Sequence, residues 1–439
     1  MMNRNENLTF SLLTFGCKVN AYESEAIKEE MIKAGFVYKE EMPADLIFIN
    51  TCAVTLVSEN KAMEKIRSLG RNYPSSRLIV LGCFAQLHPE RIKAVPEVSL
   101  IIGTKDRKQI VNLVKGILNE KEQEVLVDKN SRLFSYDPVS ISHFNASVRA
   151  FVKIQDGCDN FCSYCVIPLT RGKSRSRDKD EVIQEIQRLV DNGYKEIVLT
   201  GIDIGSYADH GLRLDDLVYQ ILHTVQGQYR LRISSLEMSQ IDSRYIELYK
   251  NEKKLVPHIH IPLQSGSERI LELMNRKYDL NHFLEVVKVL KEEIPDVALS
   301  TDVITGFPSE TEQDFLDSVE FIKKVRFMRL HVFPYSRRPY TKADKMKEQL
   351  TNAVKKDRAR RLIKVGEELA QEYFDQNIGR ELNVLIEEKL ADNKDGSATY
   401  RGYSENYLDL KVRSAHDIVG KMVKGLLQED GFLEVKEII

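Results

Sequence analysis

The sequence contains no apolar stretch long enough to cross a membrane. Its longest apolar runs have the length of a strand, such as residues 78–82, whereas a membrane-spanning helix needs about 18 or more apolar residues. The first ten residues lack the apolar core of a secretory signal peptide. These absences exclude a transmembrane protein and predict a cytoplasmic one with no membrane partner.

An excess of basic charge is also missing, since 64 Lys and Arg stand against 66 Asp and Glu, a net charge of −2. This balance excludes a protein that coats nucleic acid with its whole surface, and it limits any nucleic-acid site to a local patch. No P-loop or dinucleotide-binding glycine pattern occurs. The histidines show no metal-ligand spacing; His258 and His260 are expected to line the interior or rim of a sheet.

The length of 439 residues predicts about three domains. In residues 8–121, strand-like runs at 12–17, 46–52 and 78–83 alternate with helical patterns at 21–35 and 58–70. Such alternation predicts an open parallel α/β sheet with helices on its faces. Residues 122–148, rich in Ser, Asn and Asp, are expected to form a linker.

The pattern resumes in residues 149–343, where six strand-like runs are each followed by a helical segment. The runs lie at 150–157, 196–204, 231–237, 258–266, 298–308 and 329–336. They predict a (β/α)6 partial barrel, whose functional groups belong at the C-terminal ends of the strands. Residues 344–376 predict a basic connecting helix, and 377–439 predict a small OB-like β-barrel. The fold class is therefore α/β with a terminal β-domain.

The six cysteines fall into two groups of three. Cys17, Cys52 and Cys83 are 35 and 31 residues apart, and each ends a predicted strand. Because the carboxyl ends of parallel strands share one edge, where ligands of open α/β sheets bind, these sulfurs are expected to meet. Buried structural cysteines are the alternative.

The second group lies in GCDNFCSYC (157–165), with the spacing C-x3-C-x2-C. Zinc sites usually have four ligands, whereas three cysteines on a 4Fe–4S cluster leave one iron open to a small molecule. A zinc knuckle or free thiols are the alternatives. This loop follows the first barrel strand and resembles that of the radical S-adenosylmethionine (SAM) superfamily. The resemblance implies that Cys158, Cys162 and Cys165 hold a cluster that binds SAM and cleaves it to a 5′-deoxyadenosyl radical. Tyr164 is expected beside the adenine or in the core.

Together, the two cysteine groups and the terminal β-domain resemble the methylthiotransferases over essentially the whole chain. The resemblance implies a second, auxiliary 4Fe–4S cluster on the first three cysteines, so that all six are expected to be catalytic and metal-binding. It also implies that the terminal domain is a TRAM-like RNA-binding module.

Several segments resemble one branch of that family, the threonylcarbamoyladenosine tRNA methylthiotransferases. They are GCKVNAYESE (16–25), NTCAVT (50–55), GCFAQ (82–86), LTRGKSRSR (169–177), LQSGSERIL (263–271) and MNRKY (274–278). This branch inserts a methylthio group at carbon 2 of N6-threonylcarbamoyladenosine next to the tRNA anticodon. The implied partners are a tRNA anticodon stem-loop, an external one-electron reductant and a sulfide or persulfide source. The alternatives are the sister branches, which act on isopentenyladenosine tRNA or a ribosomal-protein aspartate, and a non-catalytic iron–sulfur RNA-binding protein.

Polar residues at the ends of the barrel strands are candidates to bind SAM. They are Thr200, Gly201 and Asp203 after the second strand, Glu237 after the third, Gln264 and Ser265 after the fourth, and Asp302 in the fifth. A polar group buried there needs a partner, which a ligand hydroxyl or carboxylate supplies. The alternative is that some of them bond to neighbouring backbone.

Basic residues cluster beside the second cysteine group, which predicts contacts to RNA phosphates. The candidates are Arg171, Lys173, Arg175 and Arg177, with Arg337 and Arg338 further on. In the terminal domain, Tyr403 and Tyr407 are expected to stack on unpaired bases, because acidic residues outnumber basic ones from 378 to 439. The alternative for the charged runs is a solvated face.

Overall fold

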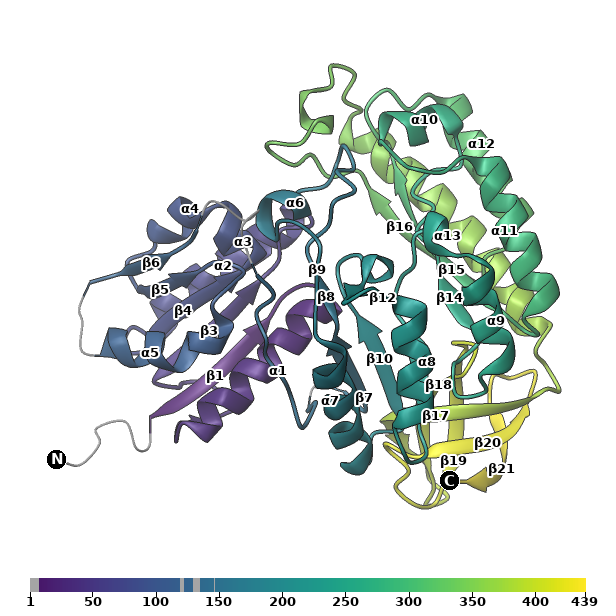
Figure 1. Ribbon diagram of the computed structural model, residues 1–439, viewed down its shortest axis with the longest axis horizontal. Helices are drawn as coiled ribbons and strands as arrows, with labels where there is room; N and C mark the ends of the chain where they lie inside the picture. The colour runs from purple at the N-terminus through teal and green to yellow at the C-terminus, as the bar shows by residue number, and fades with distance from the viewer. Residues whose placement is uncertain (1–7, 119–121, 129–134, 146) are drawn as a thin grey trace.

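Three consecutive parts of the chain each form a β-structure of a different kind (Figure 1). The computed structural model describes residues 8–118, 122–128, 135–145 and 147–439. Residues 1–7, used above to judge a signal peptide, the expected domain boundary at 121, and the linker residues 129–134 and 146 lie outside the described residues. Within the described ranges, no helix is both long and apolar enough to span a membrane.

The N-terminal domain is a six-stranded parallel sheet covered by helices on both faces. In spatial order its strands are β2 (Val37–Tyr38), β1 (Thr9–Thr14), β3 (Leu46–Thr51), β4 (Arg77–Gly82), β5 (Val98–Ile102) and β6 (Glu124–Leu126). The side chains of α1 (Lys18–Lys33) and α5 (Ile110–Leu118) pack on one face. Those of α2 (Leu56–Asn72), α3 (Cys83–Leu87) and α4 (Pro89–Lys93) pack on the other. Every residue of β3 is buried, as expected for a strand covered on both sides.

The sheet extends further than the sequence predicted. Strand β6 lies inside the range expected to be a linker, and it pairs in parallel with β5. Val139, Ile141 and Phe144 from the same range are buried in the core of the barrel. This segment therefore packs against the barrel instead of joining two domains loosely.

The central domain contains the six expected parallel strands, in chain order around a partial barrel. They are β7 (Arg149–Lys153), β10 (Glu196–Thr200), β13 (Arg230–Ile233), β14 (His258–His260), β15 (Ala298–Thr305) and β16 (Arg329–Pro334). Single bridges from Leu231 to Leu255 and from Ser235 to His260 join its two three-stranded halves. The outer helices are α7 (Lys179–Asp191), α8 (Leu214–Thr224), α9 (Ser243–Asn251), α11 (Leu280–Glu293), α12 (Glu312–Val325) and α13 (Asn352–Asp375).

Short elements decorate the barrel. They are helices α6 (Ile167–Thr170) and α10 (Glu268–Leu273), the pair β8 (Gln155–Asp156) and β9 (Arg175–Ser176), and the pair β11 (Ala208–Asp209) and β12 (Leu212–Arg213). Helix α13 starts later than the sequence predicted, because the Thr351 side chain caps it by accepting from the Val354 N–H. Its Gly366 packs against Leu330 of β16, so α13 is the sixth helix of the barrel and not a free connector.

The C-terminal domain is a curled five-stranded antiparallel sheet. Its order is β19 (Asp409–Ser414), β18 (Ala398–Ser404), β17 (Glu381–Asp392), β20 (Met422–Leu427) and β21 (Leu433–Ile438). A bridge between Lys411 and Phe432 brings its two edges together, which agrees with the expected OB-like barrel. In Figure 1 this yellow domain lies against the barrel, and Arg149 and Arg230, the first residues of β7 and β13, bond to Tyr407 and to the Asn383 carbonyl of this domain.

Candidate functional site

The first three cysteines stand at the carboxyl ends of three adjacent parallel strands, as the sequence predicted. Cys17 caps α1 after β1, Cys52 directly follows β3, and Cys83 directly follows β4. Gly16 makes the approach possible: a Cβ at this position, where φ is +117°, would lie 3.1 Å from the Cys52 sulfur. Three thiols from distant parts of the chain thus meet at one sheet edge; we call them the first trio.

Buried positive charge surrounds the first trio. Arg171 lies with its Nε 3.3 Å from the Cys83 Sγ, and its Nη1 donates to Glu23 at 2.9 Å and to Asp156 at 3.0 Å. Lys153 donates to the same two carboxylates at 2.7 Å. Although burial alone raises it, the neighbouring cations lower the pKa of Glu23 to about 2.

Arg107 and Arg175 join this buried cluster, at 2.9 Å from Glu23 and 3.0 Å from Asp156 respectively. Four cations therefore stand beside two carboxylates, and an excess of buried charge needs a counter-charge. The first trio would supply it in its thiolate form. Burial, with the neighbouring Cys83, raises the pKa of the Cys52 thiol to about 12, so metal binding would have to displace protons from these sulfurs. The donor set and its surroundings fit an iron–sulfur cluster.

The second trio, Cys158, Cys162 and Cys165, lies in one loop after β7 and β8. The Cys158 N–H donates to the Gly172 carbonyl at 3.0 Å, and a Cβ on Gly157 would lie 2.0 Å from the Lys173 carbonyl oxygen. A glycine at 157 therefore holds the start of this loop against the following one. Burial raises the pKa of Cys165 to about 12.

An arginine that the sequence analysis had assigned no role also serves the second trio. Arg276 donates from Nη1 to the Cys162 Sγ at 3.3 Å, and its Nη2 pairs with Glu237. Arg276 lies in the quoted segment MNRKY, so only its function was missed. Three free thiols with a buried guanidinium against one sulfur fit a second cluster with one open iron.

Five of the eight SAM-binding candidates line two cavities of the barrel. Thr200, Gly201 and Asp302 line a cavity of about 470 Å³, and Tyr164, Gln264 and Asp302 line one of about 230 Å³. Asp302 belongs to both, so the two cavities adjoin at this carboxylate. Tyr164 also packs edge-on against Phe307, with ring centroids 6.5 Å apart.

Three further candidates have protein partners. Asp203 lies 3.7 Å from the Cys158 Sγ and accepts from Gln240 at 2.7 Å. Glu237 is paired with Arg276. Ser265 is buried, and its hydroxyl lies 3.3 Å from that of Ser318 on α12, so it serves local structure and lines neither cavity.

The larger cavity, which we call the central cavity, joins all three domains. Cys17 and Lys18 come from the N-terminal domain, and Tyr407 comes from the C-terminal one. The barrel contributes Arg232, His258, His260 and His331 among others. Spacing gave no signal for the histidines, because His331 comes from a strand 71 residues away from His260 in the sequence. Lys18 stands next to Cys17 in the quoted segment GCKVN, which was a usable signal.

A hydrogen-bonded row of side chains crosses this cavity. The Ser300 hydroxyl lies 2.9 Å from both His258 Nε2 and His260 Nδ1, and His260 Nε2 lies 3.4 Å from Asp302. His331 approaches the same His260–Asp302 pair, with one nitrogen or oxygen of each within 4.8 Å of the others. Burial lowers the pKa of His331 and of His258.

The expectation that residues 171–177 offer four cations to RNA is wrong for most of them. Arg171 and Arg177 are buried, and Arg177 donates to Glu185 at 2.9 Å. Arg175 is held by Asp156. Only Lys173 of this segment is exposed. Charges that cluster in the sequence predict a surface patch, but here carboxylates from other elements pair with them and bury them.

The second basic pair divides in the same way. Arg338 is buried and paired with Glu59 of the N-terminal domain, so it joins two domains. Arg337 is exposed and lies 2.5 Å from Asp344. Arg337 and Lys173 thus remain the surface cations among the six predicted.

Tyr407 is not a free stacking platform. Tyr407 stacks on His258 on one side, at 4.6 Å between ring centroids, and on Tyr403 on the other, at 5.0 Å. The guanidinium of Arg232 lies 4.6 Å from the Tyr407 ring. Tyr407 therefore forms part of the cavity wall, which corrects its prediction as a base-stacking residue.

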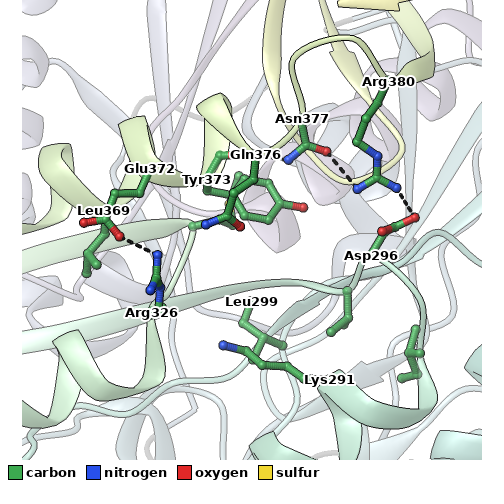
Figure 2. Close-up of a pocket in the computed structure, with 13 residues that line it drawn as sticks. Lys291, Asp296, Leu299, Arg326, Leu369, Glu372, Tyr373, Gln376, Asn377 and Arg380 are labelled. Carbon is green, nitrogen blue, oxygen red and sulfur yellow. Dashed lines mark hydrogen bonds and ion pairs between the residues drawn. The ribbon is translucent and has the colours of Figure 1, made fainter.

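A different cavity, of about 240 Å³, lies outside the barrel between the end of α13 and β15 (Figure 2). Figure 2 shows its charges paired across it: Arg326 with Glu372 at 2.8 Å, and Arg380 with Asp296. Because these charged groups are paired with one another, this cavity is a weaker candidate for a ligand site than the central cavity.

A six-stranded partial barrel with a C-x3-C-x2-C loop after its first strand defines a class of enzyme. The sequence profile of the Radical SAM superfamily matches residues 152–322, and that of Uncharacterized protein family UPF0004 matches residues 9–103. Among solved structures, the radical S-adenosylmethionine methyltransferase TsrM from Kitasatospora setae has a TM-score of 0.57 at 14% identity. The match covers 76% of this chain and 74% of that one, and it shows the shared fold.

Relatives in sequence narrow the class. The threonylcarbamoyladenosine tRNA methylthiotransferase MtaB of Bacillus subtilis is 39% identical over 97% of this chain and 94% of its own. The MtaB of Thermotoga maritima is 37% identical over 94% and 92%. A tRNA-2-methylthio-N(6)-dimethylallyladenosine synthase of Thermoanaerobacter is 33% identical over 88% and 83%. The chain belongs to the family of the threonylcarbamoyladenosine tRNA methylthiotransferases.

Proposed function

We propose that this protein replaces the hydrogen at carbon 2 of N6-threonylcarbamoyladenosine, next to the tRNA anticodon, with a methylthio group. The observation that carries the proposal is the placement of the two trios. Cys17 lines the central cavity, and Tyr164, which stands between two cysteines of the second trio, lines the adjoining one, so we place both cysteine groups at one shared interior. A non-catalytic iron–sulfur carrier needs no such shared interior.

When bound, SAM would supply the methyl group and, with an electron from one 4Fe–4S cluster, the radical that an unactivated aromatic C–H requires; the other cluster would carry sulfur delivered from outside. The chain's own residues position these groups. Arg171 and Arg276 each direct an N–H at one sulfur of a trio. The Asp203 carboxylate and the Gln264 side chain stand at the rim of the barrel, where we place the SAM ribose and methionine groups.

The remaining partners follow from the balance of the reaction. Reductive cleavage of SAM consumes an electron, so an external one-electron reductant is required. Each product carries a new sulfur atom, so a sulfide or persulfide source is required. Since tRNA is the substrate, we place the reaction in the cytoplasm, with Lys173 and Arg337 as surface contacts to RNA phosphates.

The test is mass spectrometry of tRNA nucleosides from cells with and without the gene. We expect 2-methylthio-N6-threonylcarbamoyladenosine to disappear in the deletion strain while N6-threonylcarbamoyladenosine accumulates. Loss of the methylthio form of dimethylallyladenosine instead would assign the sister activity of the relative that is 33% identical. An unchanged nucleoside profile would contradict both activities.

A further inference from the structure

Positive charge gathers around Tyr407, which lines the central cavity; of the arginines concerned, Arg232 lines that cavity too. The guanidinium groups of Arg232, Arg329 and Arg149 lie 4.6, 5.2 and 5.6 Å from the centroid of the Tyr407 ring. Lys18 lines the same cavity. Each of the three arginines comes from a barrel strand: Arg149 and Arg329 are the first residues of β7 and β16, and Arg232 is the third of the four residues of β13.

Two of the four cations are neutralised within the protein. Arg232 donates to Glu196 at 2.8 Å, and Arg149 lies 2.5 Å from Glu387. Lys18 and Arg329 differ: neither has an ion pair or side-chain hydrogen bond to any residue in the described ranges. Among the described residues, Asp302 is the one carboxylate that lines the cavity, and it lies against His260.

A buried hydrogen-bonding atom is also left without a partner at this end. His258 is 5% exposed and lines the cavity, and its Nε2 lies 2.9 Å from the Ser300 hydroxyl. Its Nδ1 finds no partner among the residues that the structure describes. Buried polar atoms without partners are costly, so this nitrogen and the two free cations indicate a site that a ligand completes.

We propose that Lys18, Arg329 and His258 form a subsite for the carboxylate of the threonylcarbamoyl substituent, and so select this nucleoside over neutral N6-substituted adenosines. The inference rests on the proposed function. The substituent ends in the carboxylate of its threonine part. Lys18 follows Cys17 directly, so an adenine presented to the first trio places its N6 substituent within reach of this charged end of the cavity.

The subsite would select its substrate by rejecting neutral substituents as well as by attracting the carboxylate. A dimethylallyl group has no charge and no hydrogen-bonding atom. Its entry would displace water from Lys18 and Arg329 without replacing it by an anion, which leaves two desolvated charges unpaired. A site built to bind a charged group rejects the analogue that lacks it far more strongly than an apolar pocket rejects an added group.

The experiment measures the affinity of three synthetic anticodon stem-loop RNAs for the full-length protein. They carry N6-threonylcarbamoyladenosine, its carboxyl methyl ester, or N6-dimethylallyladenosine at the same position. The variants are Lys18→Met, Lys18→Arg and Arg329→Met, with Lys253→Met as an exposed lysine outside the cavity. Iron content per chain shows that each variant retains its clusters, and Arg329 tests the subsite far from any cysteine.

We expect Lys18→Met and Arg329→Met each to weaken binding of the carboxylate RNA about tenfold to a hundredfold, the range for a lost charge-assisted hydrogen bond. The ester and dimethylallyl RNAs should bind the wild type more weakly than the carboxylate RNA does, and neither variant should weaken their binding further, because each removes a charge that those RNAs leave unpaired. Lys18→Arg should restore most of the preference for the carboxylate RNA, and Lys253→Met should keep all of it.

Three results would overturn the inference. Equal weakening on all three RNAs would show that the cations bind a backbone phosphate. Unchanged RNA binding with weaker SAM binding would assign them to the carboxylate of SAM. No change in any affinity would show that the cations are bystanders. Since wild-type methylthiolation of the carboxylate RNA is measured alongside, each of these results leaves the proposed function standing, whereas absence of that product contradicts the function itself.

Discussion

The two trios each offer three cysteine sulfurs, but the chain brings those sulfurs together differently in each. The second trio is built from one loop of nine residues, whereas the first requires three strand ends and the sheet that aligns them. Each has one arginine whose N–H points at a sulfur, at 3.3 Å in both cases. Arg276 shares its charge with the single carboxylate Glu237, but Arg171 belongs to a buried cluster that links two domains. The second trio is therefore positioned by its own loop, whereas the first trio depends on the packing of the sheet and on the buried charges around it.

The largest effect should come from removing one trio at a time. Replacing Cys158, Cys162 and Cys165 with Ala should abolish SAM cleavage and halve the iron content of the reconstituted protein. The same change at Cys17, Cys52 and Cys83 should also halve the iron and abolish the methylthio product, yet retain SAM cleavage to 5′-deoxyadenosine. The reason is that the two trios are separate ligand sets. Methylthio product from the second variant would contradict the division of labour between them.

Replacing Arg171 or Arg276 should lower the stability of the protein by different amounts. Arg171→Met removes the guanidinium that bonds to both Glu23 and Asp156 in a buried ionic network, and it should lower the free energy of unfolding by about 3–5 kcal/mol. Arg276→Met should cost less, because the side chain of Glu237 is 21% exposed and can be hydrated. Chemical denaturation, with iron retained by each variant as a second readout, checks the order. Equal losses would show that the buried cluster adds nothing to the first trio.

Acid should lower the free energy of unfolding by removing the ion pairs around the first trio, and this loss should begin before the carboxylates are fully protonated. The pKa of Glu23 is held at about 2, below its ordinary 4.5, so its contribution is fully present above about pH 4.5. It is lost as pH falls toward 2, a total of roughly 3 kcal/mol. Denaturation midpoints of the wild type should therefore drop between about pH 5 and pH 3. Glu23→Gln should start lower and vary less over the same interval; an identical pH profile would contradict the ion-pair account.

The smallest effect should come from the exposed cations. Lys173→Ala and Arg337→Ala should weaken tRNA binding modestly, and each should reduce the slope of log affinity against log salt by about 0.9 on duplex-like RNA. The matched controls are Arg171 and Arg177, whose burial predicts stability losses without a specific change in salt slope. Titration of binding against salt decides, and unchanged slopes for both exposed variants would make these residues part of a solvated face.

Much of the fold was predictable because its signals are local. The starts of β1, β3, β4 and all six barrel strands were predicted within three residues, since short apolar runs between helical patterns have few other solutions, although several barrel strands end up to six residues earlier than predicted. Strand β6 was missed because its three residues, Glu124–Leu126, are too few to show an apolar pattern. The strand is recognisable only from its pairing with β5. The start of α13 was misplaced because the helix begins after its N-cap, Thr351, and the basic residues before that cap do not continue the helix.

The sequence by itself determined which residues bear the chemistry: the spacing of Cys158, Cys162 and Cys165 is a local property, and cysteines at strand ends follow from the alternation of elements. The tertiary structure alone decided how charge is used. It buried Arg171 and Arg177 against carboxylates from other elements, turned Tyr407 into a cavity wall, and left Lys18 and Arg329 unpaired beside it. The physical reason is that a charge acts through its partners and its hydration, and both are set by chain segments that meet only after folding.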